Sequence, residues 1–512
     1  MAMIVSGERR MSSSELQDRI ARAAAAFAGL GVGPGAGVAF CLRNEIEYFE
    51  VSLGAGMLGA YAVPINWHLS TEELRYILED SGATALVIHA DLLARLRPGI
   101  PDGVRVLVVR TSDAIRAAYG VDETLAAVPT DETDWDRWIS ACAPRTDPPS
   151  AMPLAMFYTS GTTGHPKGVR RPPFTPESQA ALATMMALDY GLNEVDPASI
   201  TTAIVGPVYH GAPNGHASAS FRAGANIVIM PRFDPEQLLE AIERERITHL
   251  NMVPVMFSRL LALPKQVRER YDLSSLRFVA HAAAPCPPEV KRAMIDWLGP
   301  IVHEYYGTTE TGNLTFCTAH EWLAHPGTVG RAINGAQIRV LDAEGNQLGP
   351  GEVGEIALRY PAFGDFTYHH GEEKRRSIDR DGFIAPGDVG YLDEDGYLYI
   401  RDRLIDMIIS GGVNIYPAEI EAALADMPGV ADSAVFGIPS AEYGESVCAV
   451  VQPQPGHQPT AEHVRAFLRA RIAGYKVPRT IEFADHLPRE DSGKIFKRKL
   501  RAPYWDNAGR AI

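Results

Sequence analysis

The stretch from Tyr158 to Val169, which reads YTSGTTGHPKGV, constrains this chain more than any other. It holds three Gly, three Thr, one Ser and one Lys, behind an apolar lead-in that starts at Leu154. Glycines let backbone N–H groups approach a ligand closely, hydroxyls donate further hydrogen bonds, and the Lys adds a point charge. This composition predicts a loop that leaves a strand and binds polyphosphate.

The loop differs from the Walker phosphate loop, in which Gly-Lys is followed directly by Ser or Thr. Here a His-Pro pair separates Gly164 from Lys167, and Gly168 follows the Lys. The Walker interpretation is therefore excluded, and an ordinary linker rich in Gly, Ser and Thr is the structural alternative.

The string resembles the phosphate-loop signature of the adenylate-forming superfamily, which contains acyl-CoA synthetases, luciferases and the adenylation domains of peptide synthetases. The resemblance implies that the loop grips the β- and γ-phosphates of ATP. The residues that it assigns to ATP are Thr159, Ser160, Gly161, Thr162, Thr163, Gly164 and Lys167.

Length and composition fit a multidomain globular enzyme. The chain has 512 residues, more than the roughly 250 to 300 at which a single core stops growing. Its formal net charge of −15 argues against a nucleic-acid surface. The five Cys form no CxxC pair, which favours neither a disulfide framework nor a zinc site and fits a reducing compartment. Because we find no signal peptide and no apolar run of membrane-spanning length, we expect a cytoplasmic enzyme without an integral membrane segment.

Strand and helix patterns alternate up to about residue 330, which favours helices packed around a mostly parallel sheet. The sequence SSSE at Ser12 to Glu15 predicts a capping box that opens a helix from Leu16 to about Leu30. A second helix is predicted over Thr71 to Ser81 and a strand over Arg105 to Val109. Residues 120–150 are rich in Asp, Thr and Pro and are predicted to be irregular.

The pattern changes twice in the last third of the chain. After about Gly330, short β segments joined by AEGN and DEDG turns predict a β subdomain. Beyond Arg401, a helix from Pro417 to Met427, two strands and a further helix predict a small α+β domain. Together with the resemblance, this predicts an α/β protein with a large N-terminal domain of helices around β-sheets, residues 1–402, and a small mobile C-terminal domain, residues 403–512.

Two segments after the phosphate loop are assigned to the acyl and adenine pockets by the resemblance. PVYHGAP resembles the family's PxxH segment, which implies that His210 lies near the acyl group. HAAAP implies that Ala283 and Ala284 lie under the adenine and that His281 and Ala282 lie along the acyl pocket. His281 stands where Ser or Gly is more usual in the family. The structural alternative is a satisfied core histidine for His210 and an ordinary strand end made of small residues for HAAAP.

The string YYGTTETG, from Tyr305 to Gly312, is the second strong signal. An aromatic ring can stack on a base, a Thr hydroxyl can bond to a phosphate, and a carboxylate can hold magnesium against polyphosphate. By resemblance, Tyr306 stacks on adenine, Thr309 contacts the α-phosphate, and Glu310 binds magnesium.

Downstream, an Asp and a hinge segment complete the implied nucleotide site. Asp388 precedes the DEDG turn and resembles the family's ribose-binding Asp, with Arg403 assisting it. The segment RLIDMIISGGVNIYPAEI resembles the acyl-CoA synthetase hinge, although Ile405 replaces its usual charged residue. Gly411 and Gly412 would let the backbone approach a slender ligand such as the pantetheine arm of coenzyme A.

The segment LPREDSGKIFKRKLR, near the C-terminal end, carries the implied catalytic Lys494. By resemblance, this Lys bridges the carboxylate and the α-phosphate during in-line displacement. Lys497, Arg498 and Lys499 are candidates for contacts with the phosphates of coenzyme A, and a solvated basic face is the alternative.

The implied enzyme is an AMP-forming acid–thiol ligase that uses ATP, magnesium and coenzyme A. A carboxylic acid reacts with ATP to give an acyl-adenylate and pyrophosphate, and the thiol of coenzyme A then displaces AMP. The acid is left open among aromatic, alicyclic or steroid-like, and medium-chain fatty acids, and a homodimer is also left open. The alternatives are a carrier-protein loader, a luciferase-like oxygenase and a nucleotide-binding protein without catalysis.

Overall fold

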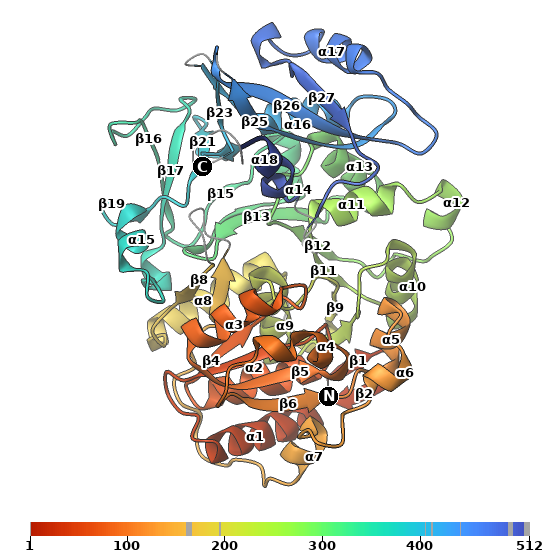
Figure 1. The fold of residues 1–512 in the computed structure, drawn as a ribbon, viewed down its shortest axis with the longest axis vertical. Helices are drawn as coiled ribbons and strands as arrows, with labels where there is room; N and C mark the ends of the chain where they lie inside the picture. The colour runs from red at the N-terminus through yellow and green to blue at the C-terminus, as the bar shows by residue number, and fades with distance from the viewer. Residues whose placement is uncertain are drawn as a thin grey trace.

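The computed structural model describes residues 2–159, 166–193, 196–404, 406–410, 413–440, 442–489 and 495–505. Figure 1 shows the N-terminal part of the chain at the bottom of the view and the C-terminal strands and helices at the top. Strands and helices alternate through most of the N-terminal part, which confirms the predicted α/β class.

A parallel sheet in the order β4-β3-β5-β6 forms from the first part of the chain. Its strands are β4 (Tyr61–Pro64), β3 (Gly37–Cys41), β5 (Ala83–His89) and β6 (Arg105–Val109). Its neighbouring helices are α1 (Ser13–Gly29), α2 (Glu47–Met57), α3 (Thr71–Ser81) and α4 (Ala90–Leu96). The predicted capping box of α1 is present, because the Ser12 side chain accepts from the Glu15 N–H and the Glu15 carboxylate accepts from Ser12.

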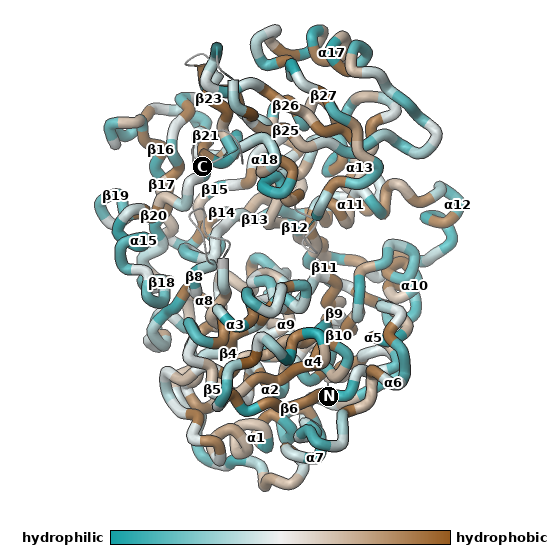
Figure 2. The backbone as a smooth tube through the Cα atoms, viewed as in Figure 1, coloured by the Kyte–Doolittle hydropathy of each residue, from teal (hydrophilic) through white to brown (hydrophobic). Residues whose placement is uncertain are grey.

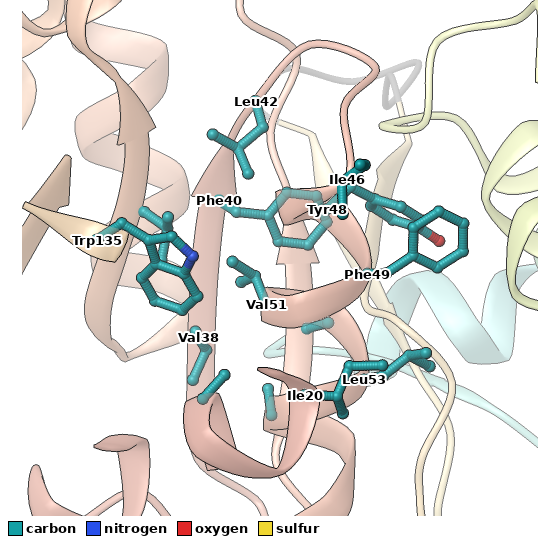
Figure 3. Close-up of a cluster of buried hydrophobic side chains, with 14 of the residues drawn as sticks. Ile20, Val38, Phe40, Leu42, Ile46, Tyr48, Phe49, Val51, Leu53 and Trp135 are labelled. Atoms are coloured by element: carbon teal, nitrogen blue, oxygen red, sulfur yellow. The ribbon is translucent and has the colours of Figure 1, made fainter. Parts of the chain in front are cut away.

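Large apolar side chains fill the space between this sheet and its helices (Figure 3). Phe40 of β3 packs edge-on against Tyr48 of α2, and Trp135 lies beside Phe27 of α1. Trp135 comes from the segment that we predicted to be irregular, and that prediction is wrong. The segment contains the short helices α6 (Glu123–Ala126) and α7 (Trp135–Ser140), and it is held in place because the Trp135 indole is buried and donates to Glu50.

A longer sheet runs in the order β15-β14-β13-β12-β11-β9-β10-β1-β2. Its central strands, from β13 to β1, are parallel, and its edges are antiparallel. The strands are β1 (Met3–Ser6), β2 (Arg9–Ser12), β9 (Thr201–Ile204), β10 (Asn226–Ile229), β11 (His249–Met252), β12 (Phe278–His281), β13 (Val302–Thr308), β14 (Gly312–Cys317) and β15 (Arg331–Ala332). Sequence analysis missed the β1–β2 hairpin, which adds the N-terminal residues to this sheet beside β10.

The helices that accompany this part of the chain vary from single turns to several turns. They are α5 (Asp113–Tyr119), α8 (Pro176–Asp189), α9 (Gly211–Ala223), α10 (Pro235–Glu245), α11 (Pro254–Leu261), α12 (Lys265–Arg268), α13 (Pro288–Leu298) and α14 (Ala319–Ala324). Every helix in the described ranges is too short or too polar to cross a membrane. Figure 2, which colours the backbone by residue hydropathy, shows hydrophobic residues around β4, β5 and β6.

The predicted β subdomain is present as a sheet in the order β19-β20-β17-β21-β22, with β16 paired to β17. Its strands are β16 (Gln337–Leu341), β17 (Gly354–Arg359), β19 (Asp379–Arg380), β20 (Phe383–Ile384), β21 (Asp388–Leu392) and β22 (Leu398–Arg403). A separate small sheet joins β7 (Phe157–Thr159), β8 (Lys167–Arg170) and β18 (Thr367–Tyr368), and helix α15 (Glu372–Ser377) follows β18.

The C-terminal segment has its own sheet, in the order β24-β23-β26-β25 with β27 paired to β26. The strands are β23 (Ile408–Ser410), β24 (Val413–Ile415), β25 (Val430–Ser440), β26 (Gly444–Pro453) and β27 (Thr480–Phe483). Its helices are α16 (Pro417–Ala425), α17 (Ala461–Arg469) and α18 (Lys497–Trp505), and Ile408, Ile415, Leu424 and Val464 belong to its separate core. The predicted boundary at residues 402 and 403 falls at the end of β22.

A buried ion pair links α13 to the long sheet. The Lys291 ammonium lies 2.5 Å from a carboxylate oxygen of Glu304 on β13, and both residues are buried. The Lys291 ammonium also lies 5.0 Å from the ring centroid of Trp322. Burial raises the pKa of Glu304, and Lys291 opposes that rise.

We expect Lys291→Met to lower the free energy of unfolding by about 3–5 kcal/mol, because it leaves a buried carboxylate without its cation. The loss should be larger in alkaline than in mildly acidic solution. A carboxyl whose pKa is raised in the folded state is tolerated as a neutral acid at low pH and destabilises the fold once it ionises. Chemical denaturation at several pH values measures this.

The matched control is Lys265→Met, which removes a Lys from an exposed pair with Glu269 at 3.6 Å. That variant should lose less than about 1 kcal/mol at any pH. Equal losses in the two variants would contradict a stabilising role for the buried pair.

Candidate active site

The predicted phosphate loop connects β7 to β8, which pair as an antiparallel hairpin with Thr159 opposite Lys167. The predicted ligands Ser160, Gly161, Thr162, Thr163 and Gly164 lie outside the described residues. Both ends of the loop are attached to α3. The Tyr158 hydroxyl donates to Asp80 at 2.7 Å, and the Tyr76 hydroxyl donates to the Pro166 carbonyl at 3.0 Å. Helix α3 therefore fixes the position from which the loop projects.

The YYGTTETG string forms the end of β13, a tight turn and the start of β14. A Cβ at Gly307 would run into the Gly312 carbonyl, which explains the Gly at the bulge between Tyr306 and Gly307. The hydroxyls of Thr308 and Thr311 lie 3.0 Å apart, and the Thr311 N–H donates to Thr308. The turn therefore presents Thr309 and Glu310, both half-buried, at its tip.

Three residues that the sequence assigns to the nucleotide lie together although they come from separate strands. They are Tyr306, Asp388 and Arg403. The Tyr306 hydroxyl donates to Asp388 at 2.5 Å, and the Arg403 guanidinium lies 3.3 Å from the other oxygen of the same carboxylate. Asp388 and Arg403 are opposite each other in the β21–β22 pairing. Burial, followed by the Asp388 charge, holds the pKa of Tyr306 well above its usual range. A carboxylate has lone pairs for more than two donors, so Asp388 can also accept from ribose hydroxyls.

Glu310 fits the chemistry of a magnesium ligand that works together with phosphate. One of its carboxylate oxygens accepts from the Tyr368 hydroxyl at 2.8 Å. No cluster of three or more His, Cys, Asp or Glu side chains that could hold a metal occurs in the described ranges. Magnesium prefers to keep several waters and phosphate oxygens and needs only one or two carboxylates. A single oriented carboxylate is therefore sufficient for a cation that arrives with ATP.

His210 lies at the N-cap of α9, immediately before the first helical residue. Its segment is held by Asn44, a buried residue from the loop after β3. The Asn44 side chain donates to the carbonyls of Gly206 and Met230 and accepts from the Val208 N–H at 2.9 Å. Sequence analysis missed Asn44, because a single Asn after a strand carries no distinctive signal.

His281 and Ala282 lie on opposite faces of the long sheet, because successive residues of a strand alternate. Ala282 packs in a cluster with Tyr190 and Tyr305. His281 has no exposed surface, lies 3.5 Å from Glu304 and packs edge-on against Phe257. This placement in the core argues against the predicted substrate contact of His281. Burial, followed by the Lys291 charge, holds the pKa of His281 well below its usual range.

Comparison with protein families supports the nucleotide interpretation. Residues 1–364 match the AMP-binding enzyme model, and residues 419–494 match the AMP-binding enzyme C-terminal domain. The chain belongs to the AMP-binding enzyme family. This confirms the resemblance to the adenylate-forming superfamily and the arrangement of a large N-terminal and a small C-terminal domain.

Three relatives of this AMP-binding enzyme illustrate the range of the family. A fatty acid–[acyl-carrier-protein] ligase from Streptomyces coeruleorubidus is 33% identical, with 98% of this chain and 93% of the relative covered. A feruloyl-CoA synthase from an Amycolatopsis species is 35% identical, with 97% and 94% covered. The solved structure of an anthranilate CoA ligase in complex with anthranoyl-AMP has a TM-score of 0.84 and 26% identity, with 99% and 95% covered.

The C-terminal part of this AMP-binding enzyme has a cavity of about 680 Å³. Gly411, Gly412, Ile405 and Lys494 lie outside the described residues, but the flanking Ser410 and Val413 line the cavity. Its other lining residues include Tyr443, Arg465, Arg469, Tyr475 and Arg479. Arginines beside aromatic rings suit a ligand that carries both phosphate and a base. Sequence analysis missed these residues because they are dispersed along the chain.

The basic run near the C-terminal end contributes differently from what the sequence suggested. The Lys497 ammonium pairs with Glu421 of α16 at 2.8 Å and is largely buried. This pairing argues against a contact between Lys497 and the phosphates of coenzyme A. Burial tends to lower the pKa of Lys497, but the charges of Glu421, Asp402 and Asp406 outweigh it and raise that pKa.

The backbone of Ala283, in the predicted adenine segment, adopts a conformation that Ala disfavours. Its φ of 73° lies in the left-handed region, whereas its neighbours Ala282 and Ala284 do not share this feature. Left-handed backbone costs a residue with a Cβ roughly 1–2 kcal/mol. Strain of this kind often occurs where a chain is fixed by function.

We expect Ala283→Gly to raise the free energy of unfolding by up to about 1 kcal/mol, because Gly adopts positive φ without a steric penalty. Thermal or chemical unfolding measures the change. The matched control, Ala284→Gly, should be neutral or destabilising, since only the entropy of the unfolded chain changes there. A destabilised Ala283→Gly variant would show that the Ala283 methyl contributes more packing energy than the strain costs.

Proposed function

We propose that the AMP-forming acyl-CoA ligase activity of this chain acts on a carboxylic acid that bears an aromatic or alicyclic ring. The names of the feruloyl-CoA synthase and the anthranilate CoA ligase, which both cover nearly the whole chain, indicate aromatic acids.

In the first half-reaction, a carboxylate oxygen of the substrate attacks the α-phosphorus of ATP, and pyrophosphate leaves. We assign the β- and γ-phosphates to Lys167 and the loop before it, and the α-phosphate to Thr309. Asp388, Arg403 and Tyr306 would hold the ribose and the adenine, and their observed contacts support this assignment. Magnesium, held by Glu310, would neutralise phosphate charge. The protein's part is therefore to position groups and to stabilise charge.

In the second half-reaction, the thiol of coenzyme A attacks the acyl carbonyl carbon, and AMP leaves with the electron pair of the broken bond. We assign the nucleotide end of coenzyme A to the arginine-lined cavity and the pantetheine arm to the Gly411–Gly412 segment. The adjacency of Ser410 and Val413 to the cavity supports this assignment. His210 would lie near the acyl group, at the N-terminus of α9.

A carrier-protein loader is the second candidate, and the match to the fatty acid–[acyl-carrier-protein] ligase favours it. Both candidates share the adenylation step and differ only in the thiol that accepts the acyl group. The arginine-lined cavity favours coenzyme A, because a carrier protein presents no separate adenine nucleotide for the cavity to bind.

The experiment that tests the proposal incubates the purified full chain with ATP, magnesium, a panel of acids and either coenzyme A or a carrier protein, and measures AMP release and thioester formation. The panel contains hydroxycinnamic and aminobenzoic acids, a fused-ring propanoic acid and straight-chain fatty acids. We expect ring-bearing acids to give a kcat/KM at least tenfold above that of any straight-chain acid, which corresponds to about 1.4 kcal/mol of discrimination. A preference for straight chains would refute the proposed substrate class, and thioester formation on a carrier protein alone would favour the second candidate.

We expect Lys494→Ala to abolish adenylate formation, with a fall in its rate of about 10²-fold or more. The substitution removes the cation proposed to stabilise the displacement at the α-phosphate. The same variant should still transfer a preformed acyl-adenylate to coenzyme A. ATP–pyrophosphate exchange and single-turnover thioester formation measure the two steps separately.

The matched control is Lys499→Ala, a neighbouring Lys of α18 that lies over the Phe496 ring and has no proposed role in adenylation. It should leave exchange unchanged. Near-normal exchange in Lys494→Ala would refute the assignment of Lys494.

A further inference from the structure

Arg171 is the residue immediately after β8, on the exit side of the phosphate-loop hairpin, and it is 3% exposed. Its guanidinium lies 4.2 Å from the ring centroid of Phe363 and 5.5 Å from that of Phe366. The Arg171 carbonyl accepts from the Tyr61 hydroxyl at 2.6 Å. Both the backbone and the side chain of this residue are therefore fixed in one arrangement.

The Arg171 side chain donates hydrogen bonds to two separate stretches of backbone. One nitrogen donates to the carbonyls of Gly364, at 3.1 Å, and Asp365. The other donates to the carbonyls of Thr309 and Glu310. The planar guanidinium thus joins the phosphate-loop hairpin directly to the turn that carries the predicted ligands of the α-phosphate and of magnesium.

Tyr368 makes a second connection between the same two parts. It lies on β18, which pairs with β8 so that Tyr368 is opposite Val169. Its hydroxyl donates to the Glu310 carboxylate at 2.8 Å. Arg171 therefore holds the backbone of Glu310, Tyr368 holds its side chain, and both are attached to the strand that begins at Lys167.

The charge of Arg171 is not neutralised by a salt bridge within the described residues. Its recorded acceptors are all backbone carbonyls, although the charges of Asp365 and Glu310 are near. Burial lowers the pKa of Arg171 to about 10, so the side chain remains a cation at neutral pH. A buried cation without a paired carboxylate is costly unless another anion compensates it. The polyphosphate of ATP, which the proposed function assigns to the β7–β8 hairpin, would be such an anion.

We propose that Arg171 and Tyr368 are positioning residues that fix Thr309 and Glu310 relative to the phosphate loop. Arg171 orients the turn through its carbonyls and adds a positive charge beside the polyphosphate, and Tyr368 orients the Glu310 carboxylate toward the cation that accompanies ATP. This inference rests on the proposed function, because it assumes the roles of Thr309 and Glu310 in adenylation.

The first test replaces Tyr368 by Phe, which keeps the ring in its core and removes only the hydroxyl. ATP–pyrophosphate exchange is measured as a function of magnesium concentration. Because the hydrogen bond from Tyr368 orients a charged carboxylate, we expect the magnesium concentration for half-maximal exchange to rise about tenfold. A lower magnesium concentration for half-maximal exchange would show that Tyr368 competes with the metal. An unchanged concentration would show that Tyr368 has no positioning role. Either result overturns the proposal for Tyr368.

The matched control is Tyr399→Phe. Tyr399 donates to the Asp393 carboxylate at 3.2 Å on the β21–β22 hairpin, so the control removes the same kind of hydrogen bond away from Glu310. It should leave the magnesium dependence unchanged. A shift equal to that of Tyr368→Phe would mean that the effect is not specific to Glu310 and would overturn the inference.

The second test compares Arg171→Lys with Arg171→Met. Lys keeps the charge but lacks the planar fork that reaches two stretches of backbone. We expect both variants to lose about 10²-fold in kcat, since a misplaced catalytic group costs about that much. Only Arg171→Met should also raise the KM for ATP. Full recovery of activity in Arg171→Lys would show that the charge alone matters and would overturn the positioning role.

Arg170→Met is the matched control for Arg171→Met. Arg170 is the last residue of β8 and the neighbour of Arg171, but its guanidinium lies 4.7 Å from the Tyr61 ring centroid. It should keep normal kcat/KM and normal magnesium dependence. Thermal unfolding of every variant identifies those that fail to fold. If both Arg171 variants fail to fold, the comparison of Tyr368→Phe with Tyr399→Phe decides the inference.

Glu310→Gln separates failure of this inference from failure of the proposed function. If Glu310→Gln leaves magnesium dependence unchanged, the assignment of Glu310 is wrong and the positioning role falls with it. If Glu310→Gln impairs exchange and the Arg171 and Tyr368 variants do not, only the positioning role is refuted.

Discussion

The hydrogen bonds from Arg171 to backbone carbonyls of two segments are the interaction on which the assembled site depends most directly. The guanidinium of Arg171 contacts the segment around residue 310 and the segment around residue 365, and these three parts are far apart in the sequence. Such a contact is strongly directional, because a planar group offers its donors at fixed angles. Small displacements of the turn would break several hydrogen bonds at once, so the turn has one well-defined position.

Asn44 makes a comparable connection between the β4-β3-β5-β6 sheet and the long sheet. Its amide bridges Gly206 and Met230, which follow neighbouring strands of the long sheet, while its own backbone continues from β3 of the first sheet. The carboxyl ends of parallel strands are where ligands bind in open α/β sheets. A side chain that satisfies both a donor and two acceptors there keeps the PVYHGAP segment and its His210 in register with the rest of the site.

Local patterns in the sequence were sufficient for most of the fold, and the roles of the residues in the two long motifs stay predictions. The helix Thr71–Ser81, the strand Arg105–Val109 and the β subdomain agree with the predictions because capping, periodicity and turn residues are local signals. The helices within residues 120–150 were missed because α7 is held by distant contacts, such as that of Trp135 with Glu50. Arg171, Tyr368 and Asn44 could not be predicted either, since their roles depend on segments far away in the chain. The environment of His281 was missed for the same reason: strand register, which no local pattern reveals, places it beside Glu304.

The ionic cluster at the end of β22 has a different physical character from the contacts around Arg171. Asp402 accepts from the Ala418 N–H at the start of α16, and Lys497 of α18 pairs with Glu421 of α16. Burial raises the pKa of Asp402 to about 6, and the Lys497 charge opposes that rise. A buried ion pair recovers little more than its desolvation cost, so such a cluster contributes more to the precise placement of α16 and α18 than to stability. A joint that is well placed and only weakly stabilising would be physically suited to the mobility that the sequence predicts for the C-terminal domain.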